Sequence, residues 1–250
     1  EITTECCAGP YRIPNIRVDA YNVYTNNGSN GAFRGFGAAQ GCFALEGQLN
    51  ALSRASGIDA IELRLKNCLK KGERSAMGHV LLSDPRMYET LTAAASDPLW
   101  TGRAAQKKRK GDVFSGVGFA CGMKGYGIGT NGAPDYGFAQ AAITRDGGIK
   151  LTVGCIEMGQ GAFTALAAML AETLRVPYEE IGFLNLTDSA FTEETGATAS
   201  SRVTYAVGRA VSAAGEQLLD ALRELAASQR GAKPEEAVHT AGGFSVRGEM

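Results

Sequence analysis

The stretch of sequence that decides the fold is IKLTVGCIEMGQGAFTALAAMLAETL, residues 149–174. Residues 149–155 predict a strand, because residues 136–144 form a similar run and RDGG at 145–148, between the two, is a strong hairpin turn. Residues 160–174 are apolar on nearly every side, which predicts a buried helix. Strands that lead through glycine-rich turns into helices indicate an α/β protein.

The rest of the chain continues this mixture. Apolar residues at helical spacing after Gly37 predict a helix that ends at Gly57, and Asp59 with Glu62 resembles the capping box of a second helix that completes a helical hairpin. A long helix with an apolar stripe is predicted over residues 201–230. Further strands are predicted over residues 13–24, 113–121 and 181–186, and from residue 244 onward.

A polar segment without periodicity, residues 98–111, is the predicted linker between two sub-domains, residues 1–97 and 112–250. It ends in the basic run KKRK at 107–110. Such a run fits a patch for phosphate or for an acidic partner, but a solvated linker is the favoured interpretation.

Composition excludes several classes of protein. Lys plus Arg number 25 and Asp plus Glu 26, so the formal net charge is −1, which argues against a nucleic-acid-binding protein. The longest apolar run, residues 162–171, is too short for a membrane span, and no targeting segment is recognisable at the start. The six cysteines show no Cys-x-x-Cys spacing, which argues against zinc and contiguous iron–sulfur motifs; we expect reduced thiols and a cytoplasmic location.

Two glycine-rich turns precede predicted helices and fit anion cradles. They are residues 157–161 (EMGQG) and 195–201 (TGATASS), where unpaired amides at a helix start would point into a glycine-lined space. The alternative is that Ser200 and Ser201 only cap a helix and the glycines only permit close packing, and the residues alone leave both open. By contrast, GIGTNG at 127–132 matches a dinucleotide fingerprint but precedes Ala-Pro-Asp instead of a helix, so a tight loop is favoured.

A third loop, residues 31–37 (GAFRGFG), places an arginine between two aromatic rings. Arg34 offers five fixed donors, and Phe33 and Phe36 offer stacking faces for a planar ligand. An interface loop with the cation over a ring is the alternative. His79 and His239 are expected at the surface.

Taken together, residues 31–40, 157–161 and 196–202 resemble, in this order, the molybdopterin-binding subunit of the xanthine dehydrogenase and aldehyde oxidase family. LRLKN at 63–67, GPYRIPN at 9–15 and TN at 25–26 support the resemblance, which covers essentially the whole chain. It implies an α/β fold of mixed sheets packed with long helices. The two sub-domains would then be a partial first and a C-terminally incomplete second molybdopterin-binding sub-domain.

The resemblance implies a molybdenum hydroxylase, a molybdopterin-dependent oxidoreductase that inserts a water-derived oxygen into an aldehyde or an N-heterocycle. Electrons would pass through iron–sulfur clusters to a flavin or another acceptor, with the iron–sulfur clusters and FAD on partner subunits or domains. The cofactor would be molybdenum–molybdopterin, and whether it carries a cytosine dinucleotide is left open. A non-catalytic cofactor-binding or assembly module is the alternative.

The resemblance also implies roles for single residues. Arg34 and Phe36 would line the active site, Gln160 and its neighbours would bond the pterin, and residues 199–202 would hold its phosphate or nucleotide end. The metal would be held by the pterin dithiolene, with no protein ligand. The full set of implied cofactor contacts is Ala32, Phe33, Met158, Gly159, Gln160, Gly161, Thr198, Ala199, Ser200, Ser201 and Arg202.

Several family features are not found in this sequence. The cofactor loop Gly-Gly-Phe-Gly-Gly and the Gly-Glu that carries the general base are missing; Gly248-Glu249 imitates the latter but follows the long helix too closely. Thr130 stands where xanthine enzymes present a second phenylalanine, so purine specificity is not implied. We therefore expect a piece of a larger or split catalytic subunit, together with its remaining parts as partners, and no activity from this chain alone.

Overall fold

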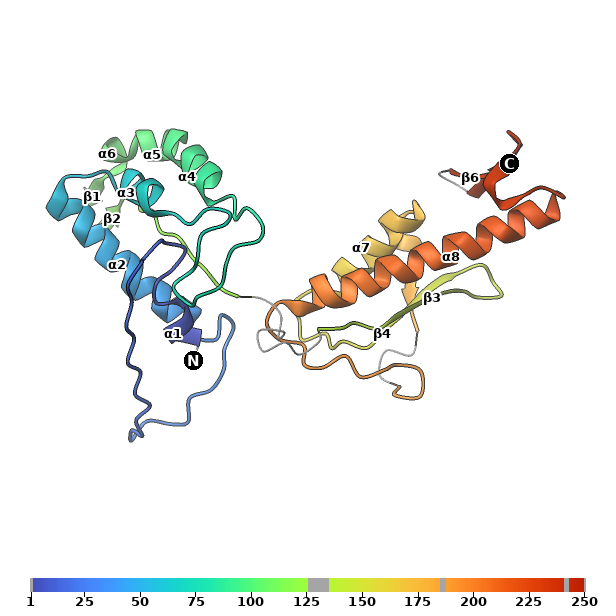
Figure 1. Ribbon diagram of the computed structural model, residues 1–250, viewed down its shortest axis with the longest axis horizontal. Coiled ribbons are helices and arrows are strands. Elements are labelled where there is room, and N and C mark those ends of the chain that lie inside the picture. Colours follow the sequence, from blue (N-terminus) through green and yellow to red (C-terminus); the bar gives the residue numbers. More distant parts are fainter. Residues whose placement is uncertain (1, 126–134, 185–187, 241–242, 250) are drawn as a thin grey trace. The chain divides into compact units, whose positions relative to one another are not determined.

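The computed structural model describes residues 2–125, 135–184, 188–240 and 243–249 (Figure 1). Its contacts divide the chain into two compact units, Glu1–Lys124 and Gly125–Met250. Helices are mixed with two-stranded and three-stranded sheets, which confirms the predicted α/β class.

The first unit is built on the predicted helical hairpin. Gly57, at φ 72°, ends the first helix in the left-handed conformation, and the Asp59 carboxylate caps the second by accepting from the amides of Ile61 (2.9 Å) and Glu62 (3.2 Å). The elements of this unit are α1 (Ile2–Cys6), α2 (Ala38–Ser56), α3 (Ala60–Asn67), α4 (Met87–Ser96), α5 (Pro98–Thr101), α6 (Arg103–Gln106), β1 (Lys108–Lys110) and β2 (Val113–Ser115).

A buried ion pair lies between α2 and α3. The Arg64 side chain is fully buried and donates to Glu46 Oε2 through Nε (2.9 Å) and Nη2 (2.7 Å). Tyr11 donates to Glu46 Oε1 (2.6 Å), and the amide of Cys121 donates to Oε2 (2.8 Å). Burial raises the pKa of the Tyr11 phenol. The network ties chain segments that are distant in sequence to one helix.

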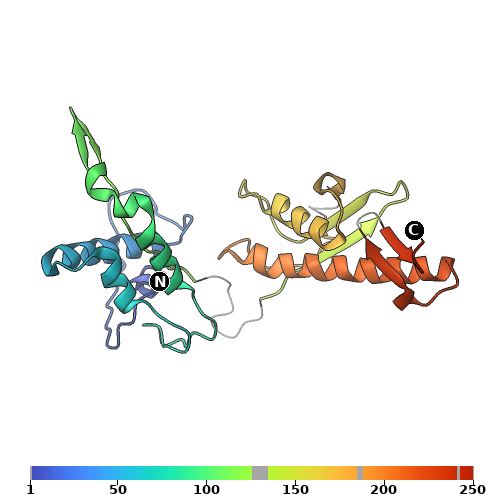
Figure 2. The same ribbon diagram turned by 90° about the horizontal axis from the view of Figure 1, so that it is seen from above.

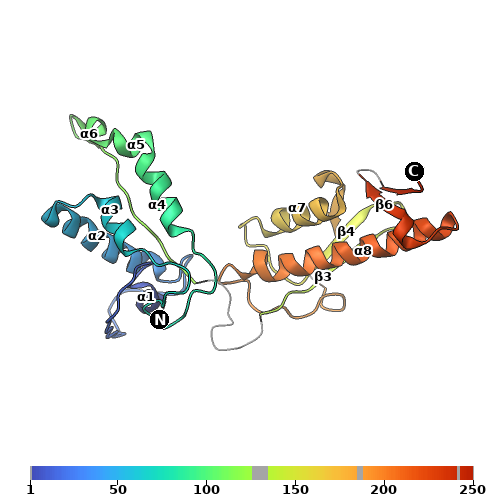
Figure 3. The same cartoon turned by 45° about the horizontal axis from the view of Figure 1, so that its top comes forward.

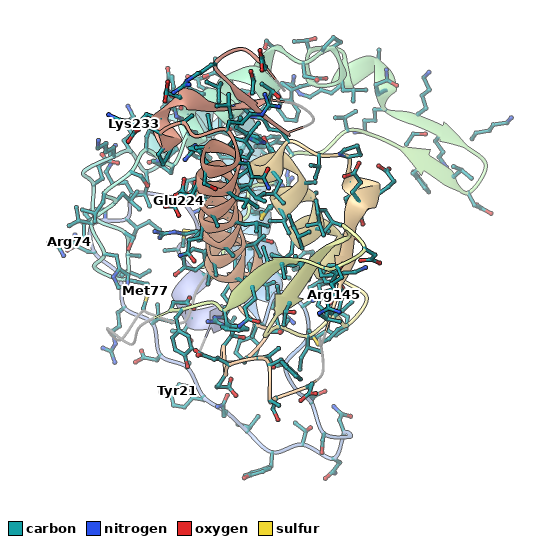
Figure 4. The ribbon with its side chains drawn as sticks, turned by 90° about the vertical axis from the view of Figure 1, so that its right-hand side faces the viewer. Tyr21, Arg74, Met77, Arg145, Glu224 and Lys233 are labelled. Atoms are coloured by element: carbon teal, nitrogen blue, oxygen red, sulfur yellow. The ribbon has the colours of Figure 1, made fainter. Side chains whose placement is uncertain are left out.

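The strand predicted over residues 13–24 is wrong, since the structure assigns no strand there. The segment instead runs away from the helices of its unit, and the residues after it return to the start of α2 (Figure 1). From Pro14 onward its apolar side chains are exposed; Tyr21, for example, is 85% exposed (Figure 4). The alternating pattern is present, but no strand among the described residues pairs with its backbone, and a strand needs such a partner.

The second predicted strand of this unit is shortened. Of residues 113–121 only β2 is extended in a sheet, where it pairs antiparallel with β1, and this hairpin projects beyond α6 (Figure 2). Residues 98–111, expected as a linker, contain α5, α6 and β1 within the first unit. Where the cofactor-binding sub-domains begin and end stays a prediction.

The second unit packs two helices on one sheet. The predicted hairpin is confirmed as β3 (Ala139–Ile143) and β4 (Ile149–Val153), with Arg145 at the turn (Figure 4), and β5 (Ile181–Phe183) pairs parallel with β4. Leu151 and Val153 of β4 are buried beneath α7 (Ala162–Leu174) and α8 (Gly208–Gln229), which lie side by side (Figure 3). Helix α7 confirms the predicted buried helix.

The predicted helix over residues 201–230 is interrupted at its start. A π-helical turn, η3 (Val203–Val207), precedes α8. The extended segment predicted from residue 244 is β7 (Gly243–Val246), which pairs with β6 (Ala237–Thr240), a strand that the sequence patterns missed. His239 of β6 is half-buried against Phe244, not at the surface as expected.

The described part of the second unit also contains two short 3-10 turns, η2 (Tyr178–Glu180) and η4 (Pro234–Glu236). The loop expected at residues 127–132 lies outside the described residues.

Candidate functional site

Two of the loops singled out in the sequence lie against each other in the second unit. We call residues 154–161, between β4 and α7, the Gln160 loop, and residues 193–202, before η3, the Ser201 loop. The amide of Ile156 donates to Thr198 Oγ1 (3.0 Å), although the two residues are 42 apart in sequence. Thr195 Oγ1 donates to the carbonyl of Gly154 (2.8 Å). These two hydrogen bonds join the loops at both ends of the contact.

Close approach of the loops requires a glycine at position 154. A Cβ atom there would lie 2.6 Å from the carbonyl oxygen of Glu193 and 2.7 Å from Thr195 Cγ2, both far below van der Waals contact. Thr195 is itself buried, so it has little room to move away. The absence of a side chain at Gly154 therefore sets the spacing of the two loops.

The start of α7 is not open, which corrects the expectation of unpaired amides there. The Glu157 carboxylate accepts from the amides of Gly159 (2.8 Å) and Gly161 (3.0 Å) through Oε1, and from the amide of Phe163 (3.0 Å) through Oε2. The hydrogen bond from Phe163 is the largest of the influences that lower the pKa of Glu157. This cradle already holds an anion, the protein's own carboxylate.

The Gln160 side chain closes its own loop. Its Oε1 accepts from the amide of Met158 (2.5 Å), and its Nε2 donates to the carbonyl of Ile156 (2.9 Å). The loop is solvent-exposed, and the Met158 side chain is 67% exposed beside it. The turn around Gln160 is therefore held by hydrogen bonds within the loop, and it exposes both polar and apolar groups.

The buried side chain of Arg202 stabilises the Ser201 loop by hydrogen bonds. Its side chain is 1% exposed, and it donates through Nε to Asp135 Oδ1 (2.6 Å) and through Nη2 to the carbonyl of Tyr136 (2.6 Å). Nη1 donates to the carbonyls of Thr195 and, at 3.3 Å, of Ala197. The geometry gives Arg202 the task of positioning this loop, while its predicted contact with the phosphate end of a cofactor stays a prediction.

Ser200 and Ser201 have an uncommon backbone conformation. Their φ angles are 50° and 55°, in the left-handed region that serine rarely adopts, and a π-helical turn follows at once. Both features concentrate at functional sites. The N-cap position of η3 is Arg202, whose side chain makes no capping hydrogen bond, so simple capping by the two serines does not describe this helix start.

The Arg34 loop, residues 31–37, belongs to the first unit and leads into α2. Gly35, Phe36 and Gly37 all have positive φ, and the amide of Phe36 donates to the carbonyl of Phe33 (2.6 Å) in a tight turn. Arg34 is exposed, and the structure gives it no hydrogen bond, ion pair or stacked ring among the described residues. The alternative of a cation held over a ring is therefore not what the structure has.

The structure thus joins the loop that carries Met158, Gly159, Gln160 and Gly161 to the loop that carries residues 198–202, through the hydrogen bonds of Ile156 with Thr198 and of Thr195 with Gly154. Ala32, Phe33, Arg34 and Phe36 lie on a loop of the other unit. Convergence of all three loops on one ligand stays a prediction. Glu157 and Thr195, which shape the site, were quoted in the sequence motifs but not recognised as site residues. A glutamate before two glycines and a helix start is the signal that could have identified the first.

Among the described residues, no group of three or more His, Cys, Asp and Glu side chains could hold a metal ion. The described part of the chain also contains no helix that is long and apolar enough to cross a membrane.

Comparison with known proteins gives one family for both halves of the chain. The family model described as a molybdopterin cofactor-binding domain matches residues 93–250, and a second model with the same description matches residues 1–68.

Similar proteins are larger than this chain. A probable xanthine dehydrogenase subunit of Bacillus subtilis (strain 168) is 33% identical over 98% of this chain and 32% of its own length. The aldehyde oxidoreductase of Megalodesulfovibrio gigas is 35% identical over 84% of this chain and 23% of its own length. The chain therefore spans about a third or less of the length of these relatives.

Solved structures share the fold. A Cu,Mo-CO dehydrogenase matches with a TM-score of 0.66 at 19% identity, over 90% of this chain and 31% of its own. The aldehyde oxidoreductase from Desulfovibrio desulfuricans ATCC 27774 matches with a TM-score of 0.63 at 25% identity, over 86% of this chain and 22% of its own.

Proposed function

The chain belongs to the molybdopterin cofactor-binding domain family, and on this premise we propose that it forms part of the catalytic subunit of a molybdenum hydroxylase. The substrate would be an aldehyde or an N-heterocycle. The observation that carries the proposal is the hydrogen-bonded contact between the Gln160 loop and the Ser201 loop, two loops quoted in the resemblance to this family.

The two loops suit different parts of a molybdopterin. Since the Glu157 carboxylate fills the start of α7, a second anion there would meet like charge, so we assign the anionic end of the cofactor to the Ser201 loop. There Thr198, Ser200 and Ser201 offer hydroxyl groups, and strained backbone precedes a helix start without a side-chain cap. The Gln160 loop, with its exposed backbone and amide, suits the uncharged edge of the pterin.

When bound, molybdenum–molybdopterin supplies the redox centre for hydroxylation. The residues of this chain hold it and orient the substrate. Arg34 has an exposed guanidinium without a partner among the described residues, so its five donors are available to a substrate or cofactor oxygen, and Phe36 offers a face to a planar ring. The general base, the iron–sulfur clusters and FAD would come from other segments or subunits.

Two finer points belong to the same proposal. Extension of the cofactor by a cytosine dinucleotide would give the Ser201 loop a longer anionic group to hold. All six cysteines are free thiols, which supports a reducing compartment and hence a cytoplasmic enzyme.

The test is to produce this chain together with the remaining segments of its catalytic subunit and to measure molybdenum, pterin form and turnover. We expect Arg34→Ala to lower turnover while molybdenum content stays near that of the unchanged enzyme. Replacing Ser200 and Ser201 together by alanine should lower molybdenum and pterin content. A folded, complete assembly without molybdenum would contradict the proposal. Unchanged turnover and cofactor content in all variants would instead favour a non-catalytic assembly module.

A further inference from the structure

Glu157 lies directly before the residues assigned to the cofactor and is not one of them. Its two carboxylate oxygens gather three backbone amides, from Gly159, Gly161 and Phe163, at 2.8–3.0 Å. We infer that Glu157 is a positioning residue, whose carboxylate holds the Gln160 loop in the conformation that binds the cofactor. This inference rests on the proposed function.

This arrangement requires glycine at positions 159 and 161 because of the backbone angles there. Gly159 and Gly161 have φ of 90° and 81°, which turns their amides toward the Glu157 carboxylate. A Cβ atom at either position would meet nothing within 4 Å, so crowding is not the reason for glycine. The reason is the left-handed backbone that the three hydrogen bonds require.

Glu157 also takes the place of an ordinary helix cap. The N-cap residue of α7 is Gly161, which has no side chain, and the first turn of α7 contains no acidic residue. A carboxylate at a helix start is favoured by the helix dipole, and its hydrogen bonds to amides are charge-assisted. The charge of Glu157, and not only its shape, therefore holds the loop.

The effect of Glu157 extends through the loop to its neighbour. Within the turn that Glu157 folds, Met158 donates to Gln160 and Gln160 donates to Ile156. Ile156 in turn donates to Thr198 of the Ser201 loop. Loss of the carboxylate would therefore loosen Gln160 first and the contact between the two loops second.

The experiment uses the complete enzyme with Glu157→Gln, which keeps the size of the side chain but removes its charge and one acceptor. We expect roughly tenfold faster loss of cofactor on dialysis, by analogy with the lower end of the loss seen when a residue that orients a cofactor-binding group is changed. Glu172→Gln is the matched control, since it removes the same charge at the other end of α7, and it should retain cofactor like the unchanged enzyme.

A second variant and a pH series keep the test independent of folding. Gly159→Ala leaves the charge in place but disfavours φ of 90°, so it should reproduce the loss. Because the pKa of Glu157 is lowered in the folded protein, its contribution is present above the ordinary carboxyl pKa and disappears as the pH falls through the lowered value. Acid should speed cofactor loss in the unchanged enzyme and have less effect in Glu157→Gln. Among the described residues, Cys155 is a titratable group whose charge interacts with Glu157; burial is the main cause that raises the pKa of its thiol, so the thiol stays neutral throughout this range.

The outcomes separate the two proposals. Retention of cofactor by both Glu157→Gln and Gly159→Ala, with loss in the alanine variant of Ser200 and Ser201, overturns the positioning role and leaves the proposed function intact. Tighter binding in Glu157→Gln would show that Glu157 competes with the cofactor, which also overturns it. If the unchanged complete enzyme binds no molybdopterin, the proposed function fails.

Discussion

Each unit of the molecule buries one arginine completely, and the two arginines do different work. Arg64 and Arg202 are 0% and 1% exposed, and each pairs with a nearly buried carboxylate. Arg64 binds Glu46 with two nitrogens, and also Asn50 Oδ1 (2.9 Å) and the carbonyl of Ala60 (2.8 Å). Its partners are on α2 and α3, so it joins regular elements.

Arg202 instead joins loop to loop. Beyond Asp135, its acceptors are backbone carbonyls of Tyr136, Thr195 and Ala197. Carbonyls that lack partners in regular structure must be satisfied when buried, and a guanidinium with five donors satisfies several at once. A buried arginine therefore stabilises the core in the first unit, where it is Arg64, and shapes a candidate binding loop in the second, where it is Arg202.

The largest effect is expected at Arg64. Arg64→Ala leaves the Glu46 carboxylate buried without its counter-charge, which should lower the free energy of unfolding by about 3–5 kcal/mol. Denaturant unfolding of the chain measures it. The double variant Arg64→Met with Glu46→Gln removes both charges but keeps an acceptor for the Tyr11 hydroxyl or the Cys121 amide, so it should recover part of the loss. A double variant as unstable as the single one would contradict this interpretation of the ion pair.

At Arg202 we expect a smaller loss in the free energy of unfolding than at Arg64, and a larger loosening of the neighbouring loop. Arg202→Lys keeps the charge but cannot reach Asp135 and the carbonyls together, so about 2–3 kcal/mol should be lost from unsatisfied acceptors. Hydrogen exchange should accelerate at residues 195–202, and the complete enzyme should hold less molybdenum. If hydrogen exchange accelerated equally throughout the second unit, Arg202 would stabilise the core as Arg64 does, and the two arginines would not differ in role.

The contact between the loops can be changed without touching either arginine. Gly154→Ala places a Cβ atom 2.6 Å from the Glu193 carbonyl, so we expect a loss of about 1–2 kcal/mol and separation of the two loops. Faster exchange of the Ile156 amide, which donates to Thr198, reports the separation. Protection of this amide at the original level would show that the Arg202 contacts alone hold the Ser201 loop in place.

The smallest effect has the opposite sign and belongs to the first unit. Gly47 lies inside α2, where an added Cβ atom meets nothing within 4 Å. Gly47→Ala should therefore stabilise the chain by about 0.5–1 kcal/mol through the unfolded state and helix propensity. Unfolding midpoints measure the gain. Hydrogen exchange in the Ser201 loop should not change, and a change there would couple the loop to the stability of α2.

Local patterns predicted the regular elements well where one residue or a short period decides them. The RDGG turn fixes the β3–β4 hairpin, and the apolar residues of α7 fix a buried helix. The strand expected over residues 13–24 failed, because alternation alone does not supply the partner strand that a β-segment needs.

In the candidate site, too, local sequence patterns identified some features and missed others. The glycine-rich sequences around Gln160 and Ser201 identified both loops, since glycine content is a local signal for unusual backbone. Neither pattern showed that Glu157 fills the first cradle, and neither paired Arg202 with Asp135, which is 67 residues away. Pairing of distant polar groups depends on which segments become neighbours when apolar surface is buried.

By itself the sequence determined the class of the fold, the positions of its main helices and turns, and the family resemblance, because all three are written in residues close together or in motifs of fixed order. Only the tertiary structure decided that the Gln160 and Ser201 loops share hydrogen bonds, that one cradle is closed by a carboxylate, and which buried arginine serves the core. These outcomes depend on distances between atoms that the chain brings together only when it folds, since a buried charge or amide must find its partner in space.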